Sequence, residues 1–143
     1  MKSRLAALII GIGLAAVLAT PLVAHHSFAA EYDASRPVTL TGVVTRIEWT
    51  NPHSHLFLDV KDDRGTITSW KFELGSPTVL VTQCGWNART LHVGDQVTVE
   101  GAMAKDNATT ANARVLTLAD GRRVSAGSSG GDQPPPRQPA IVP

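Results

Sequence analysis

The sequence lacks a pair of cysteines: Cys84 is the only one among 143 residues. A single thiol cannot form an internal disulfide, so folds stabilised by disulfides are excluded. Cys84 follows the apolar residues Val79, Leu80 and Val81, and we therefore expect it to be buried. A soft metal ligand and an intermolecular disulfide are the alternative roles for this residue.

No apolar run is long enough to span a bilayer, which takes about 20 residues. The run from Leu5 to Leu18 follows a basic start and precedes Leu-Val-Ala, with small Ala24 where a signal peptidase would cut. Residues 1–24 are therefore predicted to be a signal peptide, with cleavage after Ala19 or Ala29 as the alternatives. The mature protein is expected in the periplasm, or secreted, with no membrane segment left after cleavage.

Neither sign of charge predominates. The chain has 13 Lys and Arg against 12 Asp and Glu, and loss of Lys2 and Arg4 with the signal peptide leaves eleven basic residues against twelve acidic ones. Nucleic-acid binders normally have a clear basic excess on one face. We therefore expect no nucleic-acid partner.

Catalytic signatures are missing as well. Ser27, Ser54 and Ser76 have no nucleophile-elbow or triad context, and no glycine-rich phosphate loop precedes a helix. Adjacent carboxylates occur only at Asp62-Asp63, in a segment that reads as a solvated turn. A non-catalytic role is therefore favoured, although enzymatic activity is left open.

Three zones make up the mature chain. Residues 25–36 form a short polar lead, residues 37–124 alternate like a compact domain, and residues 125–143 are rich in Gly, Ser, Gln and Pro. The last zone has too little apolar surface to offset its ordering entropy, so we predict a disordered tail.

The central zone predicts a mainly β domain. Ser76-Pro77 and Gly85 suit the start and end of one short helix, and Gly42 marks a change of face in the first strand. The five expected strands are Val38–Trp49, His55–Lys61, Thr66–Leu74, Val97–Gly101 and Ala111–Leu118. With the helix between strands 3 and 4, this order predicts a small five-stranded OB-fold-like barrel.

Two histidine motifs are candidates for chemistry, and the first is the predicted mature N-terminus. His25 would offer both its free amine and its ring to one metal ion, with His26 beside it. The amine titrates near pH ~8 and the imidazole near ~6.5, so a metal can displace both protons at neutral pH. A linker without function is the alternative interpretation.

The second motif is Asn51-Pro52-His53-Ser54-His55. Residues two apart on an extended segment project to the same side, so His53 and His55 can face one ion. They have the parity of Phe57, opposite the core row of Leu56 and Leu58, and are expected outside the barrel. Ordinary surface histidines are the alternative.

Together these motifs predict a metal site made of His25, His26, His53 and His55. Imidazoles with a terminal amine suit Cu(II) best, with zinc or nickel as alternatives. The site requires the lead to fold back onto the second strand, and a lead of twelve residues is long enough to do so.

Several segments of the mature chain form a specific combination. They include residues 25–33 (HHSFAAEYD), Asn51-Pro52-His53, residues 70–77 (WKFELGSP) and residues 94–101 (GDQVTVEG). Over about His25 to Ser128, the chain resembles a family of small exported bacterial proteins known only as a domain of unknown function. The resemblance implies export and a small β-rich domain, with His53 typical of the family and His55 more often replaced. The terminal histidine alone is also similar to the histidine brace of copper-dependent polysaccharide monooxygenases.

The sequence thus predicts an exported metal-binding protein that acts as a carrier, buffer or sensor, with the metal ion and a periplasmic protein as expected partners. The alternative is an OB-fold module that binds a protein, glycan or small ligand without a metal. A copper oxidase or monooxygenase is a third class, and it is disfavoured because no substrate pocket or acid–base pair is indicated.

Overall fold

The computed structural model of the protein describes residues 28–128. The predicted ligands His25 and His26, the predicted signal peptide and most of the predicted tail lie outside these residues. In chain order the elements are α2 (Phe28–Glu31), β1 (Tyr32–Glu48), β2 (His55–Lys61), β3 (Ile67–Glu73), α3 (Pro77–Thr82), β4 (Gln96–Ala104), β5 (Thr110–Thr117) and β6 (Arg123–Ser125). None of the helices between residues 28 and 128 has the length and hydropathy of a membrane span.

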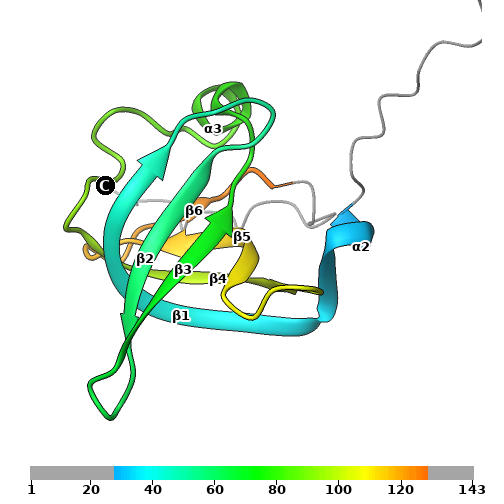
Figure 1. The fold of residues 1–143 in the computed structure, drawn as a ribbon. Coiled ribbons are helices and arrows are strands. Elements are labelled where there is room, and N and C mark those ends of the chain that lie inside the picture. The colour runs from blue at the N-terminus through cyan, green and yellow to red at the C-terminus, as the bar shows by residue number, and fades with distance from the viewer. Residues whose placement is uncertain (1–27, 129–143) are drawn as a thin grey trace, which may run out of the picture.

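The strands form one ring-like sheet (Figure 1). They are hydrogen-bonded in the order β3-β2-β1-β4-β5-β6 with antiparallel neighbours, and β3 also pairs in parallel with β5. The prediction of a mainly β domain is confirmed, and so is the short helix between the third and fourth strands. A sixth strand, β6, was not predicted; it follows the Asp120-Gly121 turn and pairs with the end of β5.

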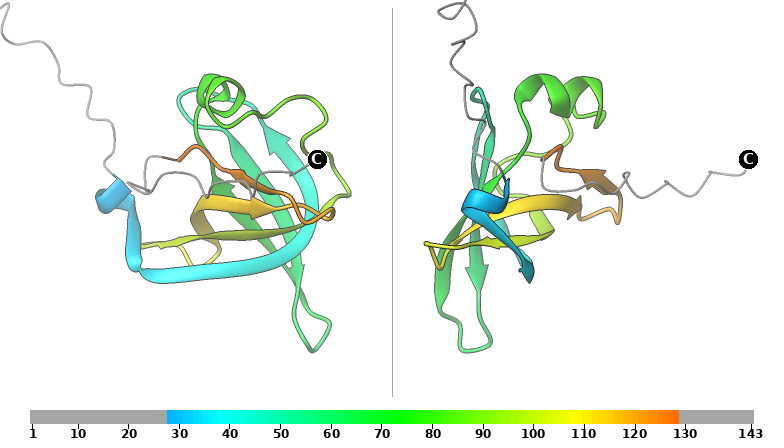
Figure 2. Two further views of the ribbon diagram at one scale, coloured as in Figure 1. Left: turned by 180° about the vertical axis from the view of Figure 1, so that it is seen from behind. Right: turned by 90° about the vertical axis from the view of Figure 1, so that its right-hand side faces the viewer.

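β1 is long enough to serve both halves of the sheet. Its first part, up to Val43, pairs with β4, and its last part pairs with β2. The strand curves between these parts, as Figures 1 and 2 show. Gly42 lies where β1 passes from pairing with β4 to pairing with β2. A Cβ atom at Gly42 would come 2.7 Å from the backbone oxygen of Asp59 in β2. Glycine is needed here because the two strands approach too closely for a side chain.

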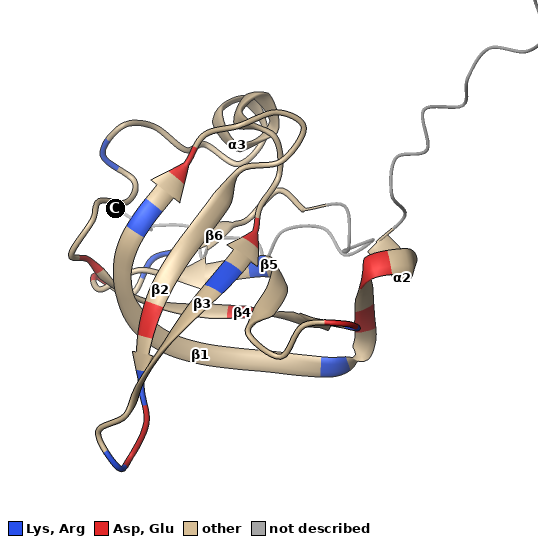
Figure 3. Ribbon diagram, viewed as in Figure 1, with Lys and Arg blue, Asp and Glu red and all other residues tan. Residues whose placement is uncertain are grey.

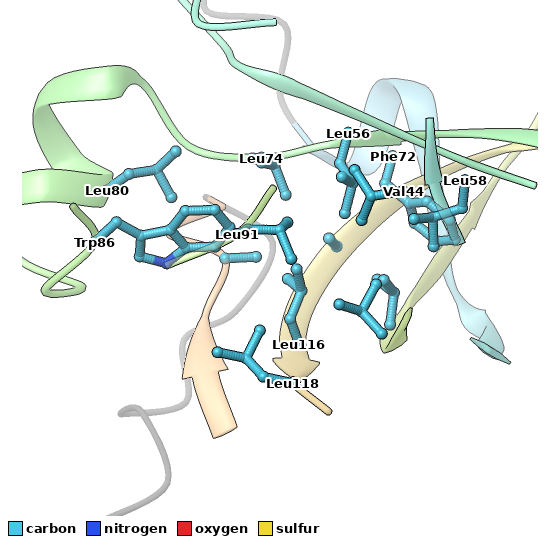
Figure 4. Packing of buried hydrophobic residues seen from close by; sticks show 14 of the residues in the cluster. Val44, Leu56, Leu58, Phe72, Leu74, Leu80, Trp86, Leu91, Leu116 and Leu118 are labelled. Atoms are coloured by element: carbon cyan, nitrogen blue, oxygen red, sulfur yellow. The ribbon is translucent and has the colours of Figure 1, made fainter. Parts of the chain in front are cut away.

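The core lies inside the ring and combines alternate residues of the strands with Leu80 of α3 and with Trp86 and Leu91 of the following loop (Figure 4). Leu56 and Leu58 of β2 and Phe72 of β3 are fully buried, whereas their neighbours face outward. Full burial of such a side chain contributes about 1.5–3 kcal/mol relative to exposure. The same alternation confirms that His55, which precedes Leu56, lies on the outer face.

Helix α3 lies at one end of the ring in the views of Figures 1 and 2. Its start is capped as predicted, because Oγ of Ser76 accepts a hydrogen bond from the backbone N–H of Val79. Gly85 takes a left-handed φ of 73° shortly after its end. The buried Trp86 then donates from Nε1 to the backbone oxygen of Ser125, at 2.8 Å, and so ties this region to β6.

Candidate functional site

The two predicted histidine ligands of the described chain lie where β1 ends and β2 begins. His55 is the first residue of β2 and is paired with Glu48 of β1 on one side and Glu73 of β3 on the other. Cross-strand partners share a face, so a Glu-His-Glu row crosses the outer side of the sheet. The acidic residues that Figure 3 shows at the ends of β1 and β3 are the two glutamates of this row, Glu48 and Glu73.

His53, in the loop before β2, contacts one of the same glutamates. Its Nδ1 lies 3.0 Å from Oε1 of Glu73, and its side chain is 32% exposed. The loop is held by Thr50, whose Oγ1 donates a hydrogen bond of 2.7 Å to the backbone oxygen of His53. Because Nδ1 is directed at the carboxylate, Nε2 is the ring nitrogen left for a ligand.

The contact of His55 with its neighbouring glutamate is looser. Its Nδ1 lies 3.9 Å from Oε2 of Glu48, and its side chain is 22% exposed. The structure therefore brings His53 and His55 to one side of the sheet, as predicted. The ring of His53 has the shorter contact with a carboxylate, so its orientation is fixed more firmly than that of His55.

Glu73 is the centre of this group of side chains. Its Oε2 accepts a 3.0 Å hydrogen bond from the hydroxyl of Tyr32, and its Oε1 accepts a 3.3 Å hydrogen bond from Nδ2 of Asn112. Only 13% of the Glu73 side chain is exposed. One carboxylate therefore joins the start of β1, the β1–β2 loop, the end of β3 and β5. We call Tyr32, His53, Glu73 and Asn112 the Glu73 cluster.

Sequence reasoning did not identify Tyr32, Glu73 or Asn112 as members of the site. The alternation from Trp70 to Leu74 was enough to place Glu73 on the outer face. Its partners depend on β3 pairing with β2 and β5 together, which sets Glu73 between His55 and Asn112. That pairing has no signal in the local sequence.

Asn112 has one further polar atom in the cluster. The residue is buried, and its Oδ1 has no hydrogen-bond partner within residues 28–128. An unsatisfied buried oxygen costs about 1–3 kcal/mol. A donor that reached this oxygen would therefore stabilise the cluster.

The lead is anchored beside the cluster. Tyr32 is 6% exposed and stacks with Phe28, with ring centroids 5.5 Å apart. Lys105, which follows β4, donates from its backbone N–H to the oxygen of Glu31 and from Nζ to the oxygen of Ala29. These contacts hold residues 28–32 against the end of β4.

This anchoring also explains where β1 begins. The strand starts at Tyr32 rather than at the expected Val38, because Tyr32 already pairs with Ala104 of β4. The register then shifts before Pro37, which resumes pairing opposite Ala102. The end of the lead is thus part of the sheet.

Burial sets the protonation of two groups at the site. It raises the pKa of Tyr32 well above the ordinary value near 10, and the Glu73 carboxylate raises it further. Burial lowers the pKa of His55, and the Lys71 ammonium lowers it further. Tyr32 therefore remains a hydrogen-bond donor at neutral pH, and His55 remains in the neutral form that binds metals.

Within residues 28–128, no three His, Cys, Asp or Glu side chains are arranged to hold a metal ion. His53 and His55 are thus only part of the predicted ligand set, since His25 and His26 lie outside the described residues. His92, which was not predicted as a ligand, lies in a separate turn with its Nδ1 3.6 Å from Oδ2 of Asp95.

A surface hollow is lined by none of the residues of the Glu73 cluster. It has a volume of about 490 Å³ and is lined by Asn87, Ala88, Arg89, Thr90 and Arg122. Two guanidinium groups at one hollow suit an anionic small molecule, because arginine pairs well with carboxylates and phosphates. One of them, Arg122, is already paired through Nε with Asp120 at 2.7 Å.

Comparison with known protein families gives a match that covers most of the chain. Residues 14–113 match the model of a family of unknown function, DUF6152. No curated protein and no solved structure matches the chain. The predicted resemblance to a domain-of-unknown-function family is therefore confirmed, and the matched range includes the whole Glu73 cluster.

Proposed function

The chain belongs to DUF6152, a family of unknown function, and we propose that it is an exported periplasmic protein that binds one metal ion, Cu(II) in the first place. In this proposal His25 supplies its terminal amine and ring, and His53 supplies Nε2. His26 or His55 completes the ligand set. The protein acts as a carrier, buffer or sensor, with zinc and nickel as the alternative ions.

The observation that carries the proposal is the contact between His53 and Glu73. Histidines that bind metals nearly always give their second ring nitrogen to a carboxylate, a carbonyl or water, which fixes the tautomer and the ring orientation. Nδ1 of His53 lies 3.0 Å from Oε1 of Glu73, so Nε2 is the nitrogen presented to an ion. Tyr32 and Asn112 hold the carboxylate in turn.

The anchoring of the lead also supports the proposal. Phe28 stacks on Tyr32, whose hydroxyl bonds to the same Glu73 that contacts His53. His25 precedes Phe28 by three residues, which span at most roughly 10 Å. The tether of the proposed N-terminus therefore starts at a ring that is linked to His53 through Tyr32 and Glu73.

The donor chemistry favours copper. A terminal amine and neutral imidazoles form a nitrogen-rich set, and the affinity of such sets for divalent metals peaks at Cu(II). Magnesium and calcium prefer oxygen ligands. The lowered pKa of His55 keeps its ring neutral at pH 7, which suits a fourth nitrogen donor.

We further propose that the ring-like sheet is an OB-fold. Its hydrogen bonds run round the ring from β1 through β2, β3, β5 and β4 back to β1, with α3 between β3 and β4. OB-folds bind ligands on the face of strands 2 and 3 and in the adjoining loops. His55 and Glu73 lie on this face here, and His53 lies in the loop before it.

The direct test is copper binding by a chain that begins at His25. Native mass spectrometry and competitive titration should show one Cu(II) per chain, with His53→Ala weakening the affinity at least about ten-fold. His92→Ala is the matched control, because His92 is exposed and lies in a turn outside the cluster. Addition of one glycine before His25 should weaken binding as well, because the free amine and the imidazole ring then belong to two different residues. Wild-type protein that stays free of copper at one equivalent contradicts the proposal.

A second candidate function is a metal-free OB-fold binding module, with the histidines incidental. The observation in its favour is the hollow beside Arg89 and Arg122, which suits an anionic small ligand. Titration with inorganic phosphate, citrate and acidic oligosaccharides tests it. Binding that is lost in Arg89→Ala and retained in His53→Ala would favour this candidate over copper.

A further inference from the structure

We propose that Glu73 couples docking of the lead to the orientation of His53, so that anchoring the lead and binding the metal are linked. This inference rests on the proposed metal site and concerns how that site is assembled. Glu73 and Tyr32 are positioning residues in it, because neither is a metal ligand.

The two oxygens of Glu73 serve the two parts of the site. Oε1 lies 3.0 Å from Nδ1 of His53, and Oε2 accepts the 3.0 Å hydrogen bond from Tyr32. A carboxylate is planar, so its oxygens move together. A hydrogen bond from the lead at Tyr32 therefore helps to set the position of the oxygen that faces His53.

Asn112 holds the carboxylate from the neighbouring strand. Its buried amide donates a hydrogen bond of 3.3 Å to Oε1, the same oxygen that faces His53. Because Asn112 is paired with Glu73 across β5 and β3, this support comes from within the sheet. The other partners of Glu73 are the lead on one side and the His53 loop on the other.

The lead also has anchors that do not involve Glu73. Lys105 donates to the backbone oxygens of Ala29 and Glu31, and Phe28 stacks on Tyr32. The docked position of the lead can therefore be weakened at Lys105 without touching the carboxylate. This separates an effect of lead docking from a direct effect on Glu73.

Linkage requires the coupling to act in both directions. If a docked lead strengthens metal binding by some factor, bound metal strengthens docking of the lead by the same factor. Loss of the Tyr32 hydroxyl should thus weaken metal binding although the hydroxyl is no ligand.

The first experiment needs no metal. ¹⁵N NMR of the two ring nitrogens reports which tautomer His53 adopts. We expect the Nδ1–H form in the wild type, a mixture in Glu73→Ala, and partial recovery in Glu73→Gln, whose amide oxygen can still accept from Nδ1. Tyr32→Phe should also shift the His53 signals, whereas the control Glu100→Gln should not, since Glu100 pairs with Arg123. Unchanged His53 signals in Tyr32→Phe would overturn the inference, whatever the effect of Glu73→Ala.

The second experiment measures Cu(II) affinity of chains that begin at His25. Tyr32→Phe and Lys105→Ala should each bind about ten-fold more weakly, in the range found for groups that orient metal ligands. Lys61→Ala is the control for loss of a lysine, and thermal unfolding verifies that each variant is folded. If His53→Ala binds copper weakly while Tyr32→Phe and Lys105→Ala bind it like the wild type, the proposed coupling is wrong and the proposed metal site stands. If the wild type binds no copper but its His53 signals respond to Tyr32→Phe, the metal site is wrong and the coupling of lead and ring stands.

Discussion

The hydroxyl of Tyr32 donates a 3.0 Å hydrogen bond to Oε2 of Glu73, 41 residues further along the chain. The same carboxylate lies 3.0 Å from the ring of His53 through its other oxygen. The end of the N-terminal lead and the Asn-Pro-His loop are thereby joined through one side chain that neither motif contains. This connection is the physical basis for treating them as a single site.

Tyr32 is the only tyrosine of the chain, so its ionisation can be followed by the absorbance of tyrosinate alone. Burial and the Glu73 carboxylate raise its pKa, and we expect a midpoint well above the ordinary value of about 10. Glu73→Gln should lower the midpoint but leave it raised, because burial is the larger cause. A wild-type midpoint near 10 would contradict the buried, hydrogen-bonded phenol.

Ionisation of the Tyr32 hydroxyl should also lower the stability of the fold at alkaline pH. Because the pKa is higher in the folded state, the contribution of Tyr32 is fully present below about pH 10 and is lost as the pH rises towards the folded-state value. Urea unfolding at a series of alkaline pH values should show this decline in the wild type. The free energy of unfolding of Tyr32→Phe should decline less over the same range. An equal decline in both proteins would show that Tyr32 is not its cause.

His55 should remain neutral at pH values where an exposed histidine is half protonated. Burial is the main cause of its lowered pKa, and the Lys71 ammonium is the second. NMR titration should give a midpoint below about 6.5, and Lys71→Gln should raise it part of the way back. Lys61→Gln serves as the control. Because the folded-state pKa is lowered, the contribution of His55 to stability is present above about pH 6.5 and is lost as the pH falls below it.

Copper should stabilise the protein if the proposed site exists. A ligand that binds only the folded state adds about 2.7 kcal/mol at a free concentration 100 times its Kd. Thermal unfolding of the chain that begins at His25 should therefore shift upward with Cu(II) and return after chelation. The shift should be much smaller in His53→Ala, and a shift of equal size in that variant would place the ion elsewhere.

The core beneath the site should dominate stability. Leu58 of β2 is fully buried, and Leu58→Ala is expected to cost about 2–5 kcal/mol in the free energy of unfolding. Val93→Ala, at a position that is 66% exposed, should change it by no more than about 0.5 kcal/mol. Chemical denaturation of the two variants measures both values, and a small effect of Leu58→Ala would mean that the inward row of β2 is assigned wrongly.

Local patterns allowed correct predictions where the physics is itself local. Alternation with a period of two placed Leu56 and Leu58 inside and His55 outside, because successive residues of a strand point to opposite faces. Ser76 was recognisable as a helix cap because its side chain bonds to an N–H three residues away.

The members of the Glu73 cluster were not predictable in the same way. Glu73 looked like one more polar residue on an outer face, and Asn112 like part of a strand. Their contact follows from the parallel pairing of β3 and β5, which joins segments separated by 39 residues. The early start of β1 at Tyr32 has the same origin, since it depends on pairing with Ala104.

By itself, the sequence determined the family, the mainly β fold class, the short helix between the third and fourth strands and the face on which His55 lies. The tertiary structure decided which groups meet on that face: Tyr32, His53 and Asn112 around one carboxylate. The reason is that the face of a residue depends on the alternation within its own strand. Its partners depend on the register of strands distant in the chain, which only the assembled sheet sets.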